Sequence, residues 1–148
     1  MTNTDVEQVI KKYPWGTLYT STGDACDIPE RLRGLIASTT EVEAEHWYFL
    51  LENYIVVQGG VYESALPCID VLLTAIKHCK LSNMAIVFIY ELFYQIIHGV
   101  TDIDSIRRGN PFEAERCKTQ VLQHLEALRS KCVPEAAELL RLIINETE

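Results

Sequence analysis

The fold is decided by residues 82–99, SNMAIVFIYELFYQIIHG. The apolar side chains of this segment do not keep to one stripe; they occupy almost the whole circumference of a helix. Ser82 is a suitable N-cap and Gly99 a suitable stop, so we expect one helix between them. A helix that is apolar on nearly all sides must be covered by other elements. The segment is therefore predicted to lie at the centre of the protein.

Helical patterns flank the central segment on both sides. Thr40 and Glu43 fit a capping box, and Gly59 with Gly60 stops the helix that they open. Asn110 is the expected cap of a long helix later in the chain. The predicted helices form pairs with short internal turns: 27–37 with 41–58, 64–80 with 82–98, and 111–131 with 134–147.

The spacing of these pairs favours a repeat architecture. The pairs start at Asp27, Ser64 and Asn110, which are 37 and 46 residues apart and bracket the period of HEAT or armadillo repeats. Signals for β-structure are weak, because helical periodicity runs through the β-branched residues 55–57. We predict an all-α, HEAT/armadillo-like right-handed stack of about three antiparallel helix pairs. The alternative is a generic six-helix bundle.

Length and composition set the broad class. The chain of 148 residues fits one domain, with a short helix and loop over 1–26 and the helix pairs over 27–147. Acidic residues outnumber basic ones 21 to 13, a formal charge of −8 that disfavours direct nucleic-acid binding. No export signal or membrane-spanning run is visible, so we expect a cytoplasmic protein without membrane contact. The five cysteines lack Cys-x-x-Cys spacing and are expected to be reduced and mostly buried.

The acidic charge is concentrated in one part of the chain. Between Arg33 and Lys77 there is no Lys or Arg, but there are six acidic residues. On a helix over 41–58, three carboxylates and one tyrosine share a face opposite the expected core side chains Trp47, Leu50, Leu51, Tyr54 and Gln58. This face is interpreted either as a docking surface or as a merely solvated helix side. The partner-binding residues predicted from the docking interpretation are Glu41, Glu45, Tyr48, Glu52, Tyr62 and Glu63.

Patterns typical of enzymes are missing from the sequence. The four histidines form no His-Glu-x-x-His motif, and no glycine-rich phosphate loop occurs. A Cys–His pair that meets only in space, from Cys26 or Cys68 with His46, stays open as an alternative. We therefore predict no catalytic residue, no metal site and no cofactor, and expect that the chain is not an enzyme.

Two segments resemble a family of small bacterial HEAT-repeat-like proteins. The first is Tyr13-Pro14-Trp15-Gly16-Thr17-Leu18, followed by Asp27-Ile28-Pro29 at the start of a helix. The second is Gln58-Gly59 with Tyr62-Glu63 before the helix that contains Pro67. The family's His stands as Val57 here and its first Thr as Gly60, so no role of those residues is carried over. The resemblance covers about residues 13–75.

The resemblance implies a binding role, because some similar helical-repeat proteins are immunity proteins of bacterial toxin systems, including contact-dependent growth inhibition. We expect an immunity protein that neutralises a cognate toxin, plausibly a basic nuclease, by covering its active site with the acidic face. A HEAT-like scaffold or regulatory subunit without a toxin is the alternative, and an enzyme with an unrecognised site is the third.

Overall fold

The structure is a computed structural model that describes residues 3–145. Within that range the helices are α1 (Thr4–Lys11), α2 (Ile28–Ala37), α3 (Glu41–Ile55), α4 (Ala65–His78), α5 (Asn83–Ile97), α6 (Ile103–Arg107), α7 (Glu113–Leu122), α8 (Leu125–Lys131) and α9 (Ala137–Asn145). Short elements complete the chain: the 3-10 turns η1 (Trp15–Thr17) and η2 (Pro134–Ala136), and the strands β1 (Tyr19–Thr20), β2 (Gly23–Asp24), β3 (Val56–Val57), β4 (Gly60–Val61) and β5 (Val100–Thr101).

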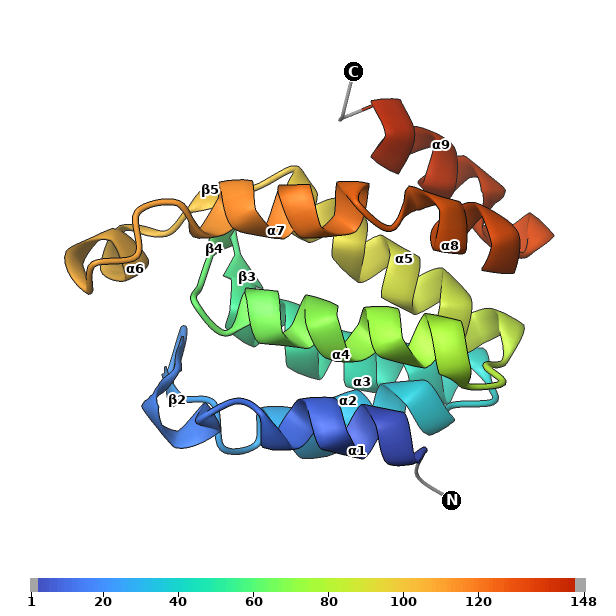
Figure 1. Cartoon of the computed structure of the whole chain (residues 1–148), viewed down its shortest axis with the longest axis horizontal. Coiled ribbons are helices and arrows are strands. Elements are labelled where there is room, and N and C mark those ends of the chain that lie inside the picture. Colours follow the sequence, from blue (N-terminus) through green and yellow to red (C-terminus); the bar gives the residue numbers. More distant parts are fainter. Residues whose placement is uncertain (1–2, 146–148) are drawn as a thin grey trace.

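The long helices are arranged in two layers (Figure 1). In one layer α4 lies between α1 and the α7–α8 run, and it contacts both. In the other layer α5 lies between α3 and α9. Helix α2 packs against α3, α4 and α5 and so joins the layers at one end of the molecule. The all-α class is confirmed at the level of a mainly helical protein.

Helix α5 occupies the centre, as its composition predicts. It contacts α2, α3, α4, α7 and α9. The Ser82 hydroxyl accepts a hydrogen bond from the amide of Ala85 at 3.1 Å and caps the helix as expected. The fully buried Tyr90 donates its hydroxyl to the carbonyl of Leu128 at 2.6 Å, which connects α5 to α8. Each large apolar side chain buried on this helix contributes roughly 1.5–3 kcal/mol to folding.

The segment after α3 differs from the prediction. The helix expected to run to residue 58 ends at Ile55, and β3 pairs with β4 in an antiparallel hairpin. Gln58 and Gly59, the two turn residues, have φ angles of 50° and 80°, the left-handed values that a two-residue hairpin turn requires. β5 then adds to β4 in parallel. Of the β-branched residues 55–57, Val56 and Val57 therefore form a strand, whereas Ile55 belongs to the helix.

The predicted helix over 111–131 is also interrupted. Asn110 does not cap it; the helix begins at Glu113, and α7 ends at Leu122 before α8 begins at Leu125. At the break the ring nitrogen Nδ1 of His124 lies 2.8 Å from the carbonyl oxygen of Gln120 and takes the place of a backbone partner. The last predicted helix consists of η2 and α9, and its residues 146–147 lie outside the described residues.

A glycine allows the parallel β4–β5 pair to form directly after α5. A Cβ atom at Gly99 would lie 2.7 Å from the carbonyl oxygen of Gly59 and 2.8 Å from Cγ2 of Val61. The first of these neighbours is backbone and cannot rotate away, so any larger residue at this position pushes the hairpin off the end of α5.

We expect Gly99→Ala to lower the free energy of unfolding by about 1–3 kcal/mol, the usual cost of overpacking. Gly16→Ala is the matched control, because its Cβ would meet only Cys26 Sγ at an ordinary 3.6 Å. Urea denaturation of both variants checks this. Equal stability of the two would contradict the close approach at Gly99.

Candidate partner-binding surface

Helix α3 begins with the hydrogen bonds of the predicted cap. The Thr40 hydroxyl accepts a hydrogen bond from the amide of Glu43 at 3.2 Å. In return the Glu43 carboxylate accepts hydrogen bonds from the hydroxyls of Thr39 and Thr40, each at 3.1 Å. These bonds hold the pKa of Glu43 below its ordinary value, so it carries a negative charge at neutral pH. The first turn of α3 is thereby fixed with its carboxylates facing solvent.

The exposed side of α3 combines acidic and apolar groups. Glu41, Glu43 and Glu45 are exposed, and no Lys or Arg occurs in the helix. Val42 is 80% exposed and Phe49 is 47% exposed. Large apolar side chains held in water are typical of interaction surfaces when they occur together. We call this set, Glu41, Val42, Glu43, Glu45 and Phe49, the α3 surface.

The position predicted for Tyr48 is wrong. The tyrosine is only 5% exposed and its ring packs against Phe88 of α5, with 5.4 Å between the ring centres. The buried residues of α3 are Ala44, Tyr48, Leu51 and Ile55. On a helical wheel this buried face is rotated by roughly 80° from the expected one. The rotation arises because α3 is packed between α2 and α5 and buries sides toward both.

Glu52 lies at the edge between α3 and α5. Its side chain is half-buried, and desolvation together with the negative charge of Glu91 on α5 raises its pKa. The hydroxyl of Tyr48 hydrogen-bonds to Glu52 and partly offsets this. Gln95 donates to Glu91 at 3.0 Å. No Lys or Arg of the described chain forms an ion pair with either carboxylate, so negative charge accumulates at this edge.

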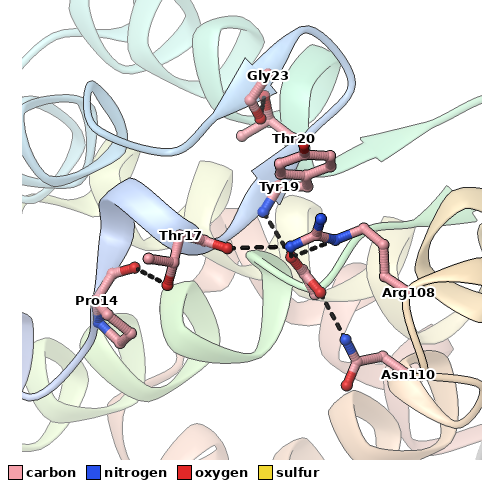
Figure 2. A network of polar contacts seen from close by, with 8 residues as sticks. Pro14, Thr17, Tyr19, Thr20, Gly23, Arg108 and Asn110 are labelled. Atoms are coloured by element: carbon pink, nitrogen blue, oxygen red, sulfur yellow. Dashed lines mark hydrogen bonds and ion pairs between the residues drawn. The ribbon is translucent and has the colours of Figure 1, made fainter.

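Glu63 is the centre of an internal polar network, and its partners Tyr19, Arg108 and Asn110 are labelled in Figure 2. It is 6% exposed and accepts hydrogen bonds from the amide of Tyr19 at 2.9 Å, from Nε of Arg108 at 3.1 Å and from Asn110 at 2.6 Å. Arg108 also donates to the carbonyl of Thr17 at 3.2 Å and lies 3.5 Å from the centre of the Tyr19 ring. The prediction of Glu63 as a surface residue is therefore wrong, because Arg108 neutralises it inside the protein.

Two more residues from the stretch between Arg33 and Lys77, which contains no Lys or Arg, form hydrogen bonds inside the protein. Tyr62 is 9% exposed, and desolvation and Asp102, to which it hydrogen-bonds, raise its pKa. Asp70 accepts hydrogen bonds from Tyr13 and from Gln120. Tyr62 is thus no exposed anchor. Of the six acidic residues in the stretch, the three that are exposed all belong to α3: Glu41, Glu43 and Glu45.

A second group of exposed apolar residues was not predicted. Val100, Ile103, Ile106 and Phe112 are 70%, 57%, 48% and 61% exposed. They lie on β5, α6 and the loop before α7, which project from one end of the molecule (Figure 1). We call these four residues the α6 cluster. The only sequence signal was the set of isolated apolar residues in an otherwise polar stretch, a pattern that loops share.

Glu113, the first residue of α7, is buried without full pairing. It is 5% exposed; Nη1 of Arg116 lies 3.9 Å from one carboxylate oxygen, and the other has no hydrogen-bond partner among the described residues. Burial raises the pKa of Glu113 to about 7; Arg116 opposes this, and the nearby charge of Glu63 adds to it. Glu113 is therefore largely protonated in mildly acidic solution.

The thiols are not activated for nucleophilic chemistry. Burial raises the pKa of Cys68 and of Cys117, and a hydrogen bond to Asp24 raises the pKa of the exposed Cys26. His46, the other residue of the possible Cys–His pair, packs its ring edge-on against Trp47 at 4.8 Å. Among residues 3–145 no three acidic, His or Cys side chains are grouped to hold a metal ion. No helix in the same range is long and apolar enough to cross a bilayer.

No protein-family model, curated protein or solved structure matches the chain. The resemblance of residues 13–75 to small bacterial HEAT-repeat-like proteins therefore stays a prediction that depends on the quoted segments alone. The surface geometry of the described residues carries the functional argument.

We expect Glu63→Gln to destabilise the protein by about 1–3 kcal/mol, because the charge-assisted bonds to Arg108 and Asn110 weaken inside the structure. Glu41→Gln, an exposed carboxylate, is the control and should leave stability unchanged. Thermal unfolding at neutral pH distinguishes the two. A Glu63→Gln protein as stable as the control would show that the network is not needed for folding.

Glu113 predicts a specific pH dependence. Its pKa rises from 4.5 to about 7 on folding, so the folded state holds this proton more tightly than the unfolded state. The associated stability is fully present below pH 4.5 and is lost as the pH rises through 7, by about 3 kcal/mol in total. Glu113→Gln should therefore gain stability relative to the parent across this window, as measured by urea denaturation at several pH values. Glu126→Gln is the exposed control; a parallel pH profile for both variants would refute the assignment.

Proposed function

We propose that this protein is a non-catalytic binding protein of the immunity type, which neutralises a basic toxin domain through the α3 surface. The observation that carries the proposal is the composition of that surface. Exposed carboxylates flank Val42 and Phe49 on a helix without a single Lys or Arg. An apolar centre with charged neighbours is the usual anatomy of a protein interface.

The charge of the α3 surface defines its partner. Glu41, Glu43 and Glu45 repel acidic proteins and phosphate backbones and attract clusters of Lys, Arg and His. Glu52 and Glu91, which form no ion pair with a Lys or Arg among the described residues, extend this field to the edge of α5. A nuclease gathers cationic side chains around the phosphate that it cleaves. An acidic protein seated there excludes the nucleic acid and needs no chemistry of its own.

A HEAT/armadillo-like stack, the architecture predicted from the sequence, would suit this binding role. The helix order groups into α2–α3, α4–α5, and α7–α8 with α9, which is the number of pairs expected for a short HEAT/armadillo-like right-handed stack. Successive pairs would give one layer of helices a continuous outer face, on which α3 and α5 are neighbours. We place the protein in the cytoplasm, where it would meet an incoming toxin before the toxin reaches its substrate.

A scaffold or regulatory subunit is the second candidate, and the α6 cluster favours it. This cluster is a second exposed apolar group on a different part of the chain from the α3 surface. A protein that joins two others needs two such surfaces, whereas an inhibitor needs one.

We expect a gene next to that of this protein to encode the toxin domain, and the test uses that domain. Reversing two exposed charges, Glu41→Lys with Glu45→Lys, should reduce affinity by roughly tenfold or more at moderate salt, chiefly through slower association. Binding kinetics by surface plasmon resonance, together with inhibition of toxin activity, measure the effect.

The matched control reverses two exposed carboxylates elsewhere, Glu30→Lys with Glu126→Lys, and changes the net charge by the same amount. Affinity should fall much less in this control. Equal losses in both double variants would leave only long-range charge as the cause. Unchanged affinity in the α3 variant would remove α3 from the interface.

A further inference from the structure

A cavity of about 530 Å³ lies where the C-terminal ends of α2 and α4 meet the start of α1. This volume falls in the range of small-molecule sites. The lining of the cavity includes Thr39, whose hydroxyl donates a hydrogen bond to Glu43 of the α3 surface. The apolar part of its wall includes Val6 of α1 together with Ile36 and Ala37 of α2. A ligand of this size would thus find one hydrophobic side to rest against.

Most neutral hydrogen-bond donors of the cavity wall are already used inside the protein. The Asn3 amide donates to the carbonyl of His78 at 3.2 Å. The hydroxyl of Ser38 donates to Gly34 at 2.8 Å, and that of Ser82 donates to Ser38 at 2.6 Å. The same bonds satisfy carbonyl groups at the ends of α2 and α4, which reduces the negative potential that helix C-termini otherwise present.

The cationic donors that remain for a ligand are Lys80 and one nitrogen of Arg33. His78 also lines the cavity, but its Nδ1 lies 3.8 Å from the carboxylate of Asp5, which is not among the lining residues. Arg33 bonds to Glu7 through Nε and Nη2, at 2.9 and 2.8 Å, and keeps Nη1 for another acceptor. Lys80 is exposed and has no ion pair among the described residues. This wall is unusual in a chain with a net charge of −8.

We propose that this cavity binds a small organic phosphate. The phosphate group would accept hydrogen bonds from Lys80 and from Nη1 of Arg33, and the organic part would pack against Ile36 and Ala37. A phosphate monoester suits this wall better than a carboxylate, because it carries close to two negative charges and three acceptor oxygens, and the donors come from two separate segments. The proposal is independent of the partner bound by α3.

Phenyl phosphate is the probe for the test, with phenol as its uncharged counterpart and benzoate as its carboxylate counterpart. Titration of the full chain, followed by ¹H–¹⁵N NMR shifts, should show saturable millimolar binding of phenyl phosphate, with shifts at Ile36, Ala37 and Lys80. Phenol and benzoate should bind more weakly. Lys80→Gln should weaken phenyl phosphate binding roughly tenfold, the effect of losing one charge-assisted hydrogen bond.

Lys12→Gln, an exposed lysine that does not line the cavity, is the matched control and should bind phenyl phosphate like the parent. Unchanged melting temperatures would show that both variants fold. No saturable binding, or equal losses in the two lysine variants, would overturn the site. Phenol or benzoate binding as tightly as phenyl phosphate would overturn the phosphate assignment.

Discussion

The burial of α5 is the constraint on which the rest of the structure depends. A helix that is apolar nearly all round can exist in water only if other elements surround it, and helices α2, α3, α4, α7, α8 and α9 all contact it. Its capping at Ser82 and the hydroxyl bond from Tyr90 to α8 fix where it begins and how it lies against the C-terminal helices. The two layers follow from this, since helices must lie on several sides of α5 to cover it.

The same constraint determines which charges remain available for binding. Because α3 packs against both α2 and α5, Tyr48 turns inward and Glu52 lies at a half-buried edge beside Glu91. The exposed carboxylates that remain are those of the first turns, where the capping bonds of Thr40 and Glu43 fix the helix start. The α3 surface, which we propose for binding, is consequently smaller than the full acidic span and includes the exposed side chains of Val42 and Phe49.

Residue type and spacing predicted the elements that depend only on residues close together in the chain. The central helix and the cap at Thr40 could be identified from residue type and spacing. Gly59 was predicted only as a helix stop, and the hairpin that turns there was not predicted. The orientation of α3 could not, because it depends on two neighbours that are distant in sequence. The role of Glu63 could not be predicted either, since Arg108 lies 45 positions further along the chain. Val56 and Val57 form a strand only because β4 pairs with them, and β5 in turn pairs with β4.

The network around Glu63 has a consequence for motion. One carboxylate joins the segment at Tyr19, the start of α4 and the loop at Arg108 and Asn110, three regions far apart in sequence (Figure 2). Breaking that junction releases all of its partners at once, so the β1–β2 hairpin and the α6 region should open as a single cooperative unit rather than as two independent loops. Amide exchange in the two regions would then follow one common opening equilibrium, although some ninety residues of chain separate them.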